Sequence, residues 1–391
     1  MKLNIVADKN MPMVEAYFSE IGKITLVEGR SLSQHQLTDA DVLLVRSVTQ
    51  VNPELLQQTK VKFVGTATIG TDHIDLKFLE NRKIGFASAP GCNANSVAEF
   101  ILSALLAANY LQDLIHHNKK LAIVGLGNVG SRLAEFAEVL GLNYICYDPP
   151  KQKSETHPTR EWCNWQQLMA ADVISLHVPF TTLAPDATKH LFSTEEFQIL
   201  KKNCLLINSS RGEVVDNDAL VKHLSEHKGR DGIKVILDVW ENEPKINLAL
   251  RDLCILQTPH IAGYSVDGKC KGTEMMYHAV IDHFNLQQKQ HPDPSKQIKE
   301  TNHITWSETM DFVQNITNCV FTAYNINHDS HSLKQLDRSN IAKSFDLLRQ
   351  NYPDRLEFNH YLIEAVPRQY ISLLKALGFQ VASPILEPQN D

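Results

Sequence analysis

Three side chains between residues 211 and 260 have acid, base or cation chemistry that an enzyme could use. They are Arg211 in Asn208-Ser-Ser-Arg-Gly, Glu243 before a proline, and His260 after Thr258-Pro. A guanidinium can hold a carboxylate through two parallel hydrogen bonds, and an imidazole can transfer a proton near neutral pH. Taken singly, a surface arginine, a solvated acid and a structural histidine are the plainer interpretations. The surrounding elements must therefore show whether the three can meet.

The stretch Leu121-Ala-Ile-Val-Gly-Leu-Gly-Asn-Val-Gly130 predicts a buried strand, a glycine turn and a helix. Gly125 permits the tight turn, Gly127 lets a pyrophosphate approach the backbone, and Gly130 lets helix and strand pack closely. The helix N-terminus at Asn128-Val129 then faces the phosphates with free N–H groups. Asp148 ends the next apolar strand, where its carboxylate can accept hydrogen bonds from a ribose 2′-OH and repel a 2′-phosphate. This pattern predicts a dinucleotide site that prefers NAD to NADP.

Apolar segments predict six parallel strands around this turn, mostly with helices between them, which is typical of the doubly wound α/β sheet. The segments are Leu121–Val124, Tyr144–Tyr147, Val173–Leu176, Cys204–Asn208, Lys234–Val239 and Cys254–Gln257. In such sheets ligands lie beyond the carboxyl ends of the strands. Each segment here ends in polar or special residues, so the three candidate side chains are expected near one cleft.

The flanking regions differ in character from this nucleotide-binding part, which is expected over residues 96–263. Residues 1–95 alternate strands and helices without a glycine fingerprint, and predict a smaller substrate-binding domain completed by about 264–286. A polar, proline-broken linker follows Gln287. The remainder, to residue 391, predicts strands at Phe321–Tyr324 and Phe379–Ala382 and helices at Ile341–Leu348 and Gln369–Leu377. We interpret 287–391 as a docking or dimerisation domain, with a regulatory ligand domain as the alternative.

Composition excludes several classes of protein. With 391 residues, 43% of them hydrophobic, the chain can form two or three folded domains. The net charge of −7 argues against a nucleic-acid-binding surface. Seven cysteines without a C-x-x-C pair suggest reduced thiols, and no signal peptide or membrane-spanning stretch is apparent, so we expect a cytoplasmic protein. His223 and His227 lie four apart, but Leu224 stands where a zinc-protease helix needs Glu, so no metal site is expected.

The ordered set of motifs resembles the D-isomer-specific 2-hydroxyacid dehydrogenase family over residues 1 to about 285. The motifs are the glycine turn with its later Asp, Asn-x-x-Arg-Gly, Asp238-Val-x-x-x-Glu-Pro and Thr-Pro-His. The resemblance implies a Rossmann sheet inserted in a smaller flavodoxin-like α/β domain, followed here by a C-terminal α+β dimerisation domain. It implies NAD as cofactor, with Arg211 gripping the substrate carboxylate, His260 as proton donor and acceptor, and Glu243 paired with that histidine. Cofactor contacts are expected from Ser209, Ser210, Arg211, Asp238 and Gly263. The family usually has a small residue such as alanine before Arg-Gly, so Ser209-Ser210 departs from the pattern but leaves Arg211 in register.

The N-terminal part offers groups that suit an anionic substrate. Arg46-Ser47 follows an apolar strand, and Thr68 lies in Gly65-Thr-Ala-Thr-Ile-Gly. Ordinary turn residues at strand ends are the alternative interpretation. Within the family, Ala89-Pro-Gly-Cys-Asn, His260-Ile-Ala-Gly-Tyr264 and the added C-terminal part are similar to a subgroup acting on a phosphorylated four-carbon 2-hydroxy acid. That similarity implies substrate contacts from Ser47, Thr68 and Tyr264, and a homodimer.

Two other functions stay open at this point. A different phosphorylated acid, 3-phosphoglycerate, is the main rival substrate, because Arg46, Ser47 and Thr68 would serve phosphorylated acids generally. An NAD-sensing, corepressor-like binding protein could keep Arg211 and His260 without using them in catalysis. Turnover assays with NAD distinguish all three.

Overall fold

A computed structural model describes residues 2–154, 160–183, 185–227, 232–288 and 302–382. The chain divides into two compact units, Met1–Asn93 with Ser265–Glu300, and Ala94–Tyr264 with Thr301–Asp391. The expected linker after Gln287 lies almost wholly outside the described residues. Among the described helices none is long and apolar enough alone to cross a membrane; α4 (Ala94–Ala107) and α5 (Tyr110–His116), bent by 88°, pass that test only as a pair.

The first unit is a five-stranded parallel sheet with helices on both faces. Its strands have the order β2-β1-β3-β4-β5, which is the flavodoxin-like order. Their bounds are β1 Leu3–Asp8, β2 Gly22–Val27, β3 Val42–Val45, β4 Phe63–Thr66 and β5 Gly85–Ala87. The helices are α1 Val14–Phe18, α2 Pro53–Leu56, α3 Leu76–Asn81 and α12 Val266–Phe284. Apolar cores lie on the two faces, one containing residues of α1 and α12 and the other residues of α2 and α3.

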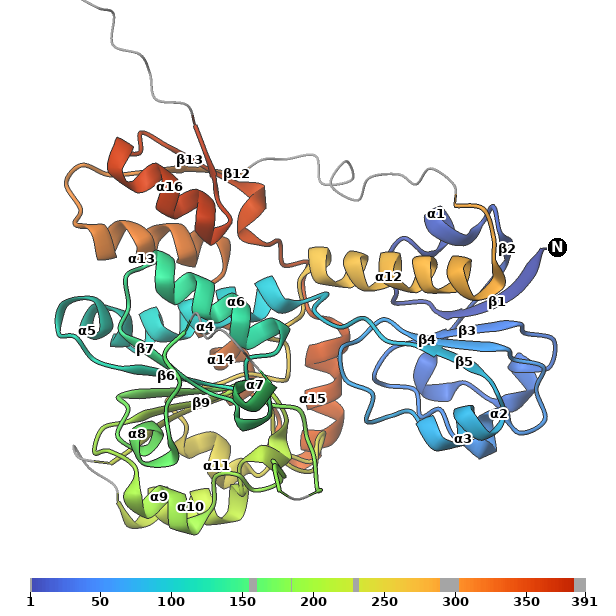
Figure 1. The fold of residues 1–391 in the computed structure, drawn as a ribbon, viewed down its shortest axis with the longest axis horizontal. Coiled ribbons are helices and arrows are strands. Elements are labelled where there is room, and N and C mark those ends of the chain that lie inside the picture. The colour runs from blue at the N-terminus through green and yellow to red at the C-terminus, as the bar shows by residue number, and fades with distance from the viewer. Residues whose placement is uncertain (1, 155–159, 184, 228–231, 289–301, 383–391) are drawn as a thin grey trace, which may run out of the picture. The chain divides into compact units, whose positions relative to one another are not determined.

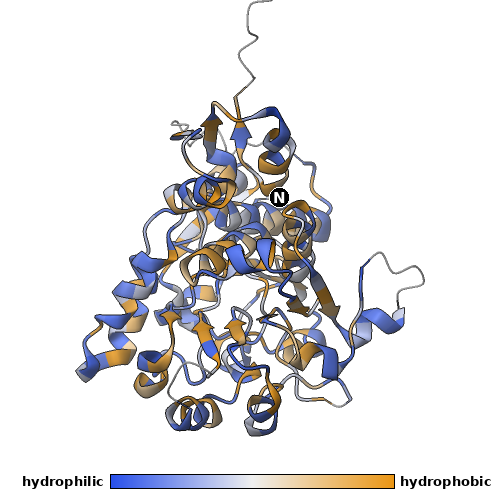
Figure 2. Cartoon of the chain, turned by 90° about the vertical axis from the view of Figure 1, so that its left-hand side faces the viewer, coloured by the Kyte–Doolittle hydropathy of each residue, from blue (hydrophilic) through white to orange (hydrophobic). Residues whose placement is uncertain are grey.

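The second unit is centred on a six-stranded parallel sheet, in the order β11-β10-β9-β8-β6-β7. Strands β6, β7 and β9 of this sheet are labelled in Figure 1. The strands are β6 Leu121–Val124, β7 Tyr144–Tyr147, β8 Val173–Leu176, β9 Leu205–Asn208, β10 Lys234–Leu237 and β11 Leu256–Gln257. Two helices precede the strands, α4 Ala94–Ala107 and α5 Tyr110–His116. The helices between the strands are α6 Asn128–Val139, α7 Pro149–Ser154, α8 Trp165–Met169, α9 Thr194–Ile199, α10 Asn217–Glu226 and α11 Leu248–Leu253. Apolar residues dominate the strands (Figure 2), because both faces are covered: α4 and α6 pack on one and α8, α9 and α10 on the other. The predicted doubly wound sheet is confirmed.

One position of this sheet was not foreseen. Trp162 forms a parallel bridge with Cys146 on the outer edge of β7, and Cys163 N–H donates to the Cys146 carbonyl at 2.9 Å. The bridge at Trp162 takes the place of the third strand in the first half of the sheet. Strand β8, Val173–Leu176, is therefore the first strand of the second half. A single bridged residue carries no periodicity, which explains why the sequence pattern missed it.

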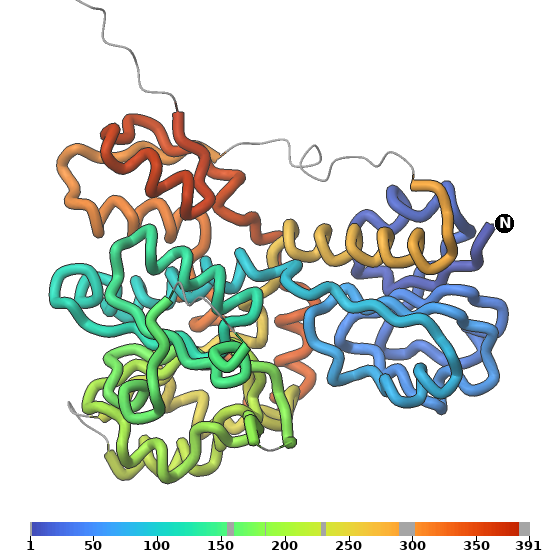
Figure 3. Tube along the Cα trace, in the orientation of Figure 1, coloured from blue at the N-terminus to red at the C-terminus, as the bar shows by residue number. Residues whose placement is uncertain are grey.

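The C-terminal segment, residues 302–382, packs within the second unit. It contains β12 Asn302–Thr305, α13 Phe312–Ala323, α14 Ile326–Lys334, α15 Ile341–Gln350, β13 Tyr361–Glu364, α16 Arg368–Leu377 and β14 Gln380–Val381, with β13 central in a parallel sheet. Its trace runs beside α4 and α6 (Figure 3), and α14 lies against β11, where the Gln257 amide donates to the Ser330 carbonyl at 2.9 Å. The segment and the nucleotide-binding sheet therefore share one apolar core.

The strand predicted at Phe321–Tyr324 was wrong, because these residues end α13. Asp311 caps that helix together with Gln314, and Ile316, Cys319 and Val320 are buried at helical spacing. The β-branched and aromatic residues of the short Phe321-Thr-Ala-Tyr stretch favoured a strand, but the capping box and the packed face set a helix.

Candidate functional site

Glu243 and His260 form the centre of the candidate site. The His260 Nδ1 lies 2.7 Å from the Glu243 Oε2, and the other carboxylate oxygen accepts from the Trp240 N–H at 2.9 Å. Because a carboxylate only accepts, Nδ1 carries a proton and Nε2 is left as the basic nitrogen. Burial alone would raise the pKa of Glu243, but His260 and the positive charge of Arg349, together with the Trp240 N–H, lower it. The pair can therefore accept or donate a proton at one defined atom, the His260 Nε2.

The loop that carries His260 is shaped by Asp238, which lies just beyond β10. Asp238 is 1% exposed, and its carboxylate accepts from the Thr258 hydroxyl at 2.6 Å and from the N–H groups of Ile261 and Ala262 at 2.8 and 3.0 Å. His260 itself has a φ of 57°, a left-handed conformation that non-glycine residues rarely adopt. Three hydrogen bonds on one buried carboxylate hold this strained turn in place. Asp238 was predicted as a cofactor contact; in the structure its bonds position the histidine, and the cofactor contact stays a prediction.

Arg211 lies at the carboxyl end of β9, at the start of the 3₁₀ turn η3 Gly212–Val214. The Asn208 amide donates to the Arg211 carbonyl at 2.9 Å, and the Arg211 Nη1 donates to the Ser210 carbonyl at 2.7 Å. A Cβ atom on Gly212 would lie 2.0 Å from the carbonyl carbon of Trp240. Only glycine therefore allows the Arg211 turn to pack directly on the backbone that leads to Glu243. This contact explains the Arg-Gly pair and brings the two motifs together.

The residues predicted to hold NAD gather at the carboxyl ends of β6, β7 and β9. Gly125 has a φ of 88°, and a Cβ on Gly130 would lie 1.9 Å from the Gly125 carbonyl oxygen, so both positions need glycine. Among the described residues no atom lies within 4 Å of a Cβ built on Gly127, which leaves open space beside the backbone there. Asn128 and Val129 begin α6, with free N–H groups at the N-terminus of a 12-residue helix. These features fit a pyrophosphate.

Two further groups suit a dinucleotide. Asp148, at the end of β7, accepts from the Leu126 N–H at 2.8 Å and from the Lys151 N–H at 3.0 Å, so its carboxylate is fixed beside the glycine turn. The Ser209 hydroxyl oxygen is buried without a hydrogen-bond partner among the described residues, whereas the Ser210 hydroxyl donates to Asn208 at 2.8 Å. Ser209 thus retains an unused donor for a ligand. Gly263 lies in the loop after His260.

The predicted substrate residues fall in both units. Arg46 and Ser47 follow β3, and Thr68 follows β4; since β3 and β4 are parallel neighbours, the three share one edge of the first unit's sheet. The Thr68 hydroxyl donates to the Gly70 carbonyl at 3.0 Å. Tyr264 belongs to the second unit, where its hydroxyl accepts from the Arg349 Nη2 at 2.9 Å.

Arg349 was missed by sequence reasoning. It lies on α15, 85 residues beyond Tyr264, in a part of the chain without a recognisable motif. A single arginine in an amphipathic helix gives no sequence signal of a site. The contact emerges only from the packing of the C-terminal segment.

Comparisons with known proteins give the same family by two routes. Residues 106–262 match the family model of the D-isomer specific 2-hydroxyacid dehydrogenase NAD binding domain, and residues 297–378 match a domain of unknown function (DUF3410). A curated relative from Saccharophagus degradans, erythronate-4-phosphate dehydrogenase, is 41% identical over 97% of this chain and 100% of its own. The enzyme of the same name from Psychromonas ingrahamii is 40% identical over 96% of each chain.

Solved structures share the fold at lower identity. D-lactate dehydrogenase from Aquifex aeolicus, complexed with NAD and lactic acid, has a TM-score of 0.58 at 24% identity, over 72% of this chain and 95% of that one. NAD-bound 3-phosphoglycerate dehydrogenase from Entamoeba histolytica has a TM-score of 0.59 at 22% identity, over 75% and 100%. At this identity the likeness shows the fold alone.

Proposed function

The chain belongs to the erythronate-4-phosphate dehydrogenases, within the D-isomer specific 2-hydroxyacid dehydrogenase family, and we propose that it oxidises 4-phospho-D-erythronate to 2-oxo-3-hydroxy-4-phosphobutanoate. NAD is the cofactor, and the product would serve pyridoxal 5′-phosphate biosynthesis. The observation that carries the proposal is the 2.7 Å contact between His260 and Glu243, in a chain whose near full-length relatives bear this enzyme name.

Oxidation of the C2 hydroxyl requires loss of one hydride and one proton. NAD, when bound, supplies the hydride acceptor. The free His260 Nε2 takes the hydroxyl proton as the C2–H bond breaks, and the neighbouring Glu243 carboxylate stabilises the imidazolium that forms. Arg211 holds the substrate carboxylate and the oxygen at C2, which favours the developing carbonyl. In the reverse direction His260 returns the proton.

The glycine turn, Asn128, Val129 and Ser209 would hold the pyrophosphate and neighbouring parts of NAD, and Asp148 would accept hydrogen bonds from the adenine ribose. Gly263, Ser210 and Asp238 complete the proposed cofactor contacts. Arg46, Ser47, Thr68 and Tyr264 would contact the substrate. Arg46 would add a positive charge suited to a phosphorylated acid.

An absorbance assay for NADH tests this function. We expect catalytic efficiency with 4-phospho-D-erythronate to exceed that with 3-phosphoglycerate by at least about 100-fold. This ratio corresponds to about 2.7 kcal/mol of differential transition-state binding, which a site with hydrogen bonds for one polar substrate can supply. Preference for 3-phosphoglycerate would identify the rival activity. No turnover of either acid, together with NAD-dependent binding to a protein partner, would favour a corepressor-like role.

We also propose a cytoplasmic homodimer that forms through the C-terminal segment. Met310 is 44% exposed, and it lies in a groove beside α13 that is lined by Thr309, Gln314, Thr317, Asn318, Phe321 and Thr322. Met310 and Phe321 give this otherwise polar groove an apolar part that suits a second copy of the chain. Light scattering should give twice the 44.1 kDa chain mass, and Met310→Glu should shift it toward the monomer. A monomeric wild-type protein would contradict the proposal.

A further inference from the structure

Arg349 places a nearly unused guanidinium beside the candidate catalytic pair. Its Nη2 donates to the Tyr264 hydroxyl at 2.9 Å, its Cζ lies 5.5 Å from the centre of the Tyr264 ring, and its Nε is buried without a partner. Among the described residues no carboxylate lies within ion-pair distance of it. Of the five N–H donors of this guanidinium, one makes a hydrogen bond to another of the described residues.

The positive charge of Arg349 affects the pKa of Glu243 in this pair. Burial would lower the pKa of Arg349, but the opposing influence of Tyr264 and Glu243 raises it, so the side chain stays charged. The same charge contributes to the lowered pKa of Glu243. Arg349 is therefore a permanent cation close to Glu243, although it makes no direct bond to that carboxylate.

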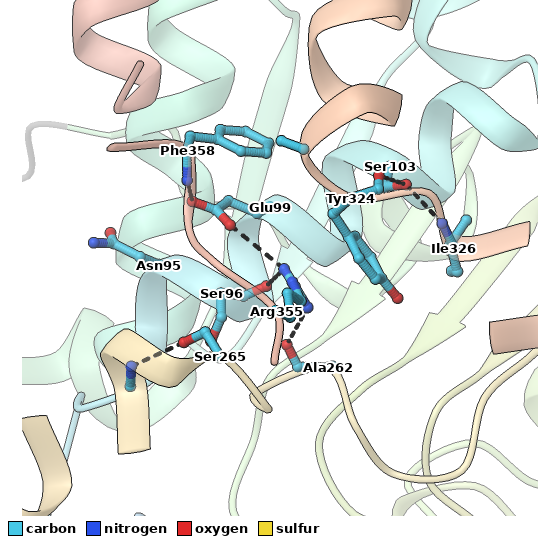
Figure 4. A network of polar contacts seen from close by, with 12 residues as sticks. Asn95, Ser96, Glu99, Ser103, Ala262, Ser265, Tyr324, Ile326, Arg355 and Phe358 are labelled. Atoms are coloured by element: carbon cyan, nitrogen blue, oxygen red, sulfur yellow. Dashed lines mark hydrogen bonds and ion pairs between the residues drawn. The ribbon is translucent and has the colours of Figure 1, made fainter. Parts of the chain in front are cut away.

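Arg355 fastens this part of the C-terminal segment to the loop that carries His260 (Figure 4). It donates to the Ala262 carbonyl at 3.1 Å and to the Ser96 carbonyl at 2.7 Å, and pairs with Glu99 at 3.5 Å. Its guanidinium lies 3.7 Å from the centre of the Tyr324 ring. Arg355 and Glu99 are 6% and 2% exposed, so removal of either would leave a buried charge unpaired. The backbone near Arg349 thus has a fixed position relative to Ala262 and its neighbours.

A purely structural role does not account for Arg349. Glu243 is already satisfied by His260 and Trp240, and the Tyr264 hydroxyl could be satisfied by any single donor. Arg349 is partly buried, and its Nε is a buried donor without a partner among the described residues, which is costly unless a ligand accepts from it. The planar fork of donors matches a phosphate, which accepts several hydrogen bonds at once.

We propose that Arg349, together with Tyr264, binds the phosphate group of the substrate. This proposal rests on the function proposed above, and it gives the C-terminal segment a part in substrate recognition. Arg211 would hold the carboxylate at one end of the four-carbon acid, and Arg349 the phosphate at the other. The segment would then account for the choice of a phosphorylated acid.

The test compares Arg349→Met with Arg338→Met on 4-phospho-D-erythronate and on D-erythronate. Arg338 is a matched control from the same segment, because its side chain is 65% exposed and its ion pair among the described residues is with the partly exposed Asp252, at 2.6 Å. We expect Arg349→Met to raise KM for the phosphorylated acid about 10- to 100-fold, the usual effect of losing a charged hydrogen bond. Efficiency on D-erythronate should change less than about threefold, and Arg338→Met should behave as wild type on both acids.

Equal losses on both acids would show that Arg349 acts through Glu243 and His260, and would overturn the proposal; so would an unchanged KM for the phosphorylated acid. If the wild-type enzyme does not turn over 4-phospho-D-erythronate, the proposed function fails by itself. In that case, the increase in melting temperature on addition of inorganic phosphate tests whether Arg349 binds phosphate. Stabilisation of wild type and Arg338→Met but not of Arg349→Met supports a phosphate site, and any other pattern contradicts it.

Discussion

Replacement of Glu243 by glutamine removes the carboxylate charge beside His260 with little change in size. At about 4 Å and an effective dielectric constant of 20, two unit charges interact by about 4 kcal/mol. The His260 and Glu243 side chains are 34% and 18% exposed, so solvent screens much of this, and about 1.4–2.8 kcal/mol remains for the imidazolium in the transition state. That loss corresponds to a fall in rate of about 10- to 100-fold.

The hydrogen bonds of the glutamine add to the loss. Glu243 accepts from both Trp240 N–H and His260 Nδ1, whereas an amide has only one oxygen. If that oxygen keeps the Trp240 bond, the NH₂ group faces Nδ1 and moves the ring proton to Nε2, where it blocks the base. We therefore expect kcat/KM of Glu243→Gln to fall about 100- to 1,000-fold, with NAD affinity nearly unchanged.

The NADH assay with 4-phospho-D-erythronate measures this effect, and Glu241→Gln is its control. Glu241 contacts His190 Nε2 at 2.7 Å, the same distance as in the Glu243–His260 pair, and it also accepts from the Asn217 N–H at 2.9 Å. Glu241→Gln should keep kcat/KM within about threefold of wild type, since His190 has no proposed part in catalysis. Wild-type efficiency in Glu243→Gln, or an equal loss in both variants, would refute the assigned role of Glu243.

Three further predictions concern the base, the cofactor and the response to acid. His260→Asn should lower kcat by about two to four orders of magnitude with NAD affinity nearly intact. Steady-state kinetics and direct NAD titration measure both quantities, and a wild-type kcat would remove His260 from the mechanism. Asp148→Ala should weaken the preference for NAD over NADP by roughly tenfold or more, and an unchanged ratio of efficiencies would remove Asp148 from the ribose. Burial lowers the pKa of His177 to about 3 from an ordinary 6.5, so the unfolded chain binds more protons there than the folded one. The free energy of unfolding should therefore fall by up to about 1.4 kcal/mol per pH unit as pH drops from 6.5 toward 3, and the fall should be less steep in His177→Gln. Urea unfolding at several pH values measures both dependences, and an equal pH dependence in the two proteins would contradict this prediction.

Much of the fold followed from local patterns. Short apolar runs with glycine, proline or polar ends predicted the strands of the six-stranded sheet to within a few residues, because both faces of such a sheet are buried. The patterns failed where a single bridge at Trp162 extends the sheet and where α13 ends in strand-like residues. In both places the outcome depends on contacts with distant parts of the chain, which periodicity does not contain.

In the candidate site, too, some residues could be predicted from the sequence and others could not. Arg211, Glu243 and His260 could be proposed because strand ends and motifs mark them. The reasons they come together could not: Gly212 packs on the Trp240 backbone, and Asp238 shapes the turn after Thr258. Arg349 lies on a helix without a motif, so its link to Tyr264 needed tertiary structure.

The crystal structure of the protein with NADH and 4-phospho-D-erythronate, a complex that cannot react because NADH accepts no hydride, tests the proposed catalytic geometry most directly. We predict that His260 Nε2 lies within about 3 Å of the C2 oxygen, with Arg211 on the carboxylate and C2 facing the nicotinamide ring. A substrate held away from His260, or a nicotinamide bound elsewhere than beside these residues, would contradict the proposed mechanism.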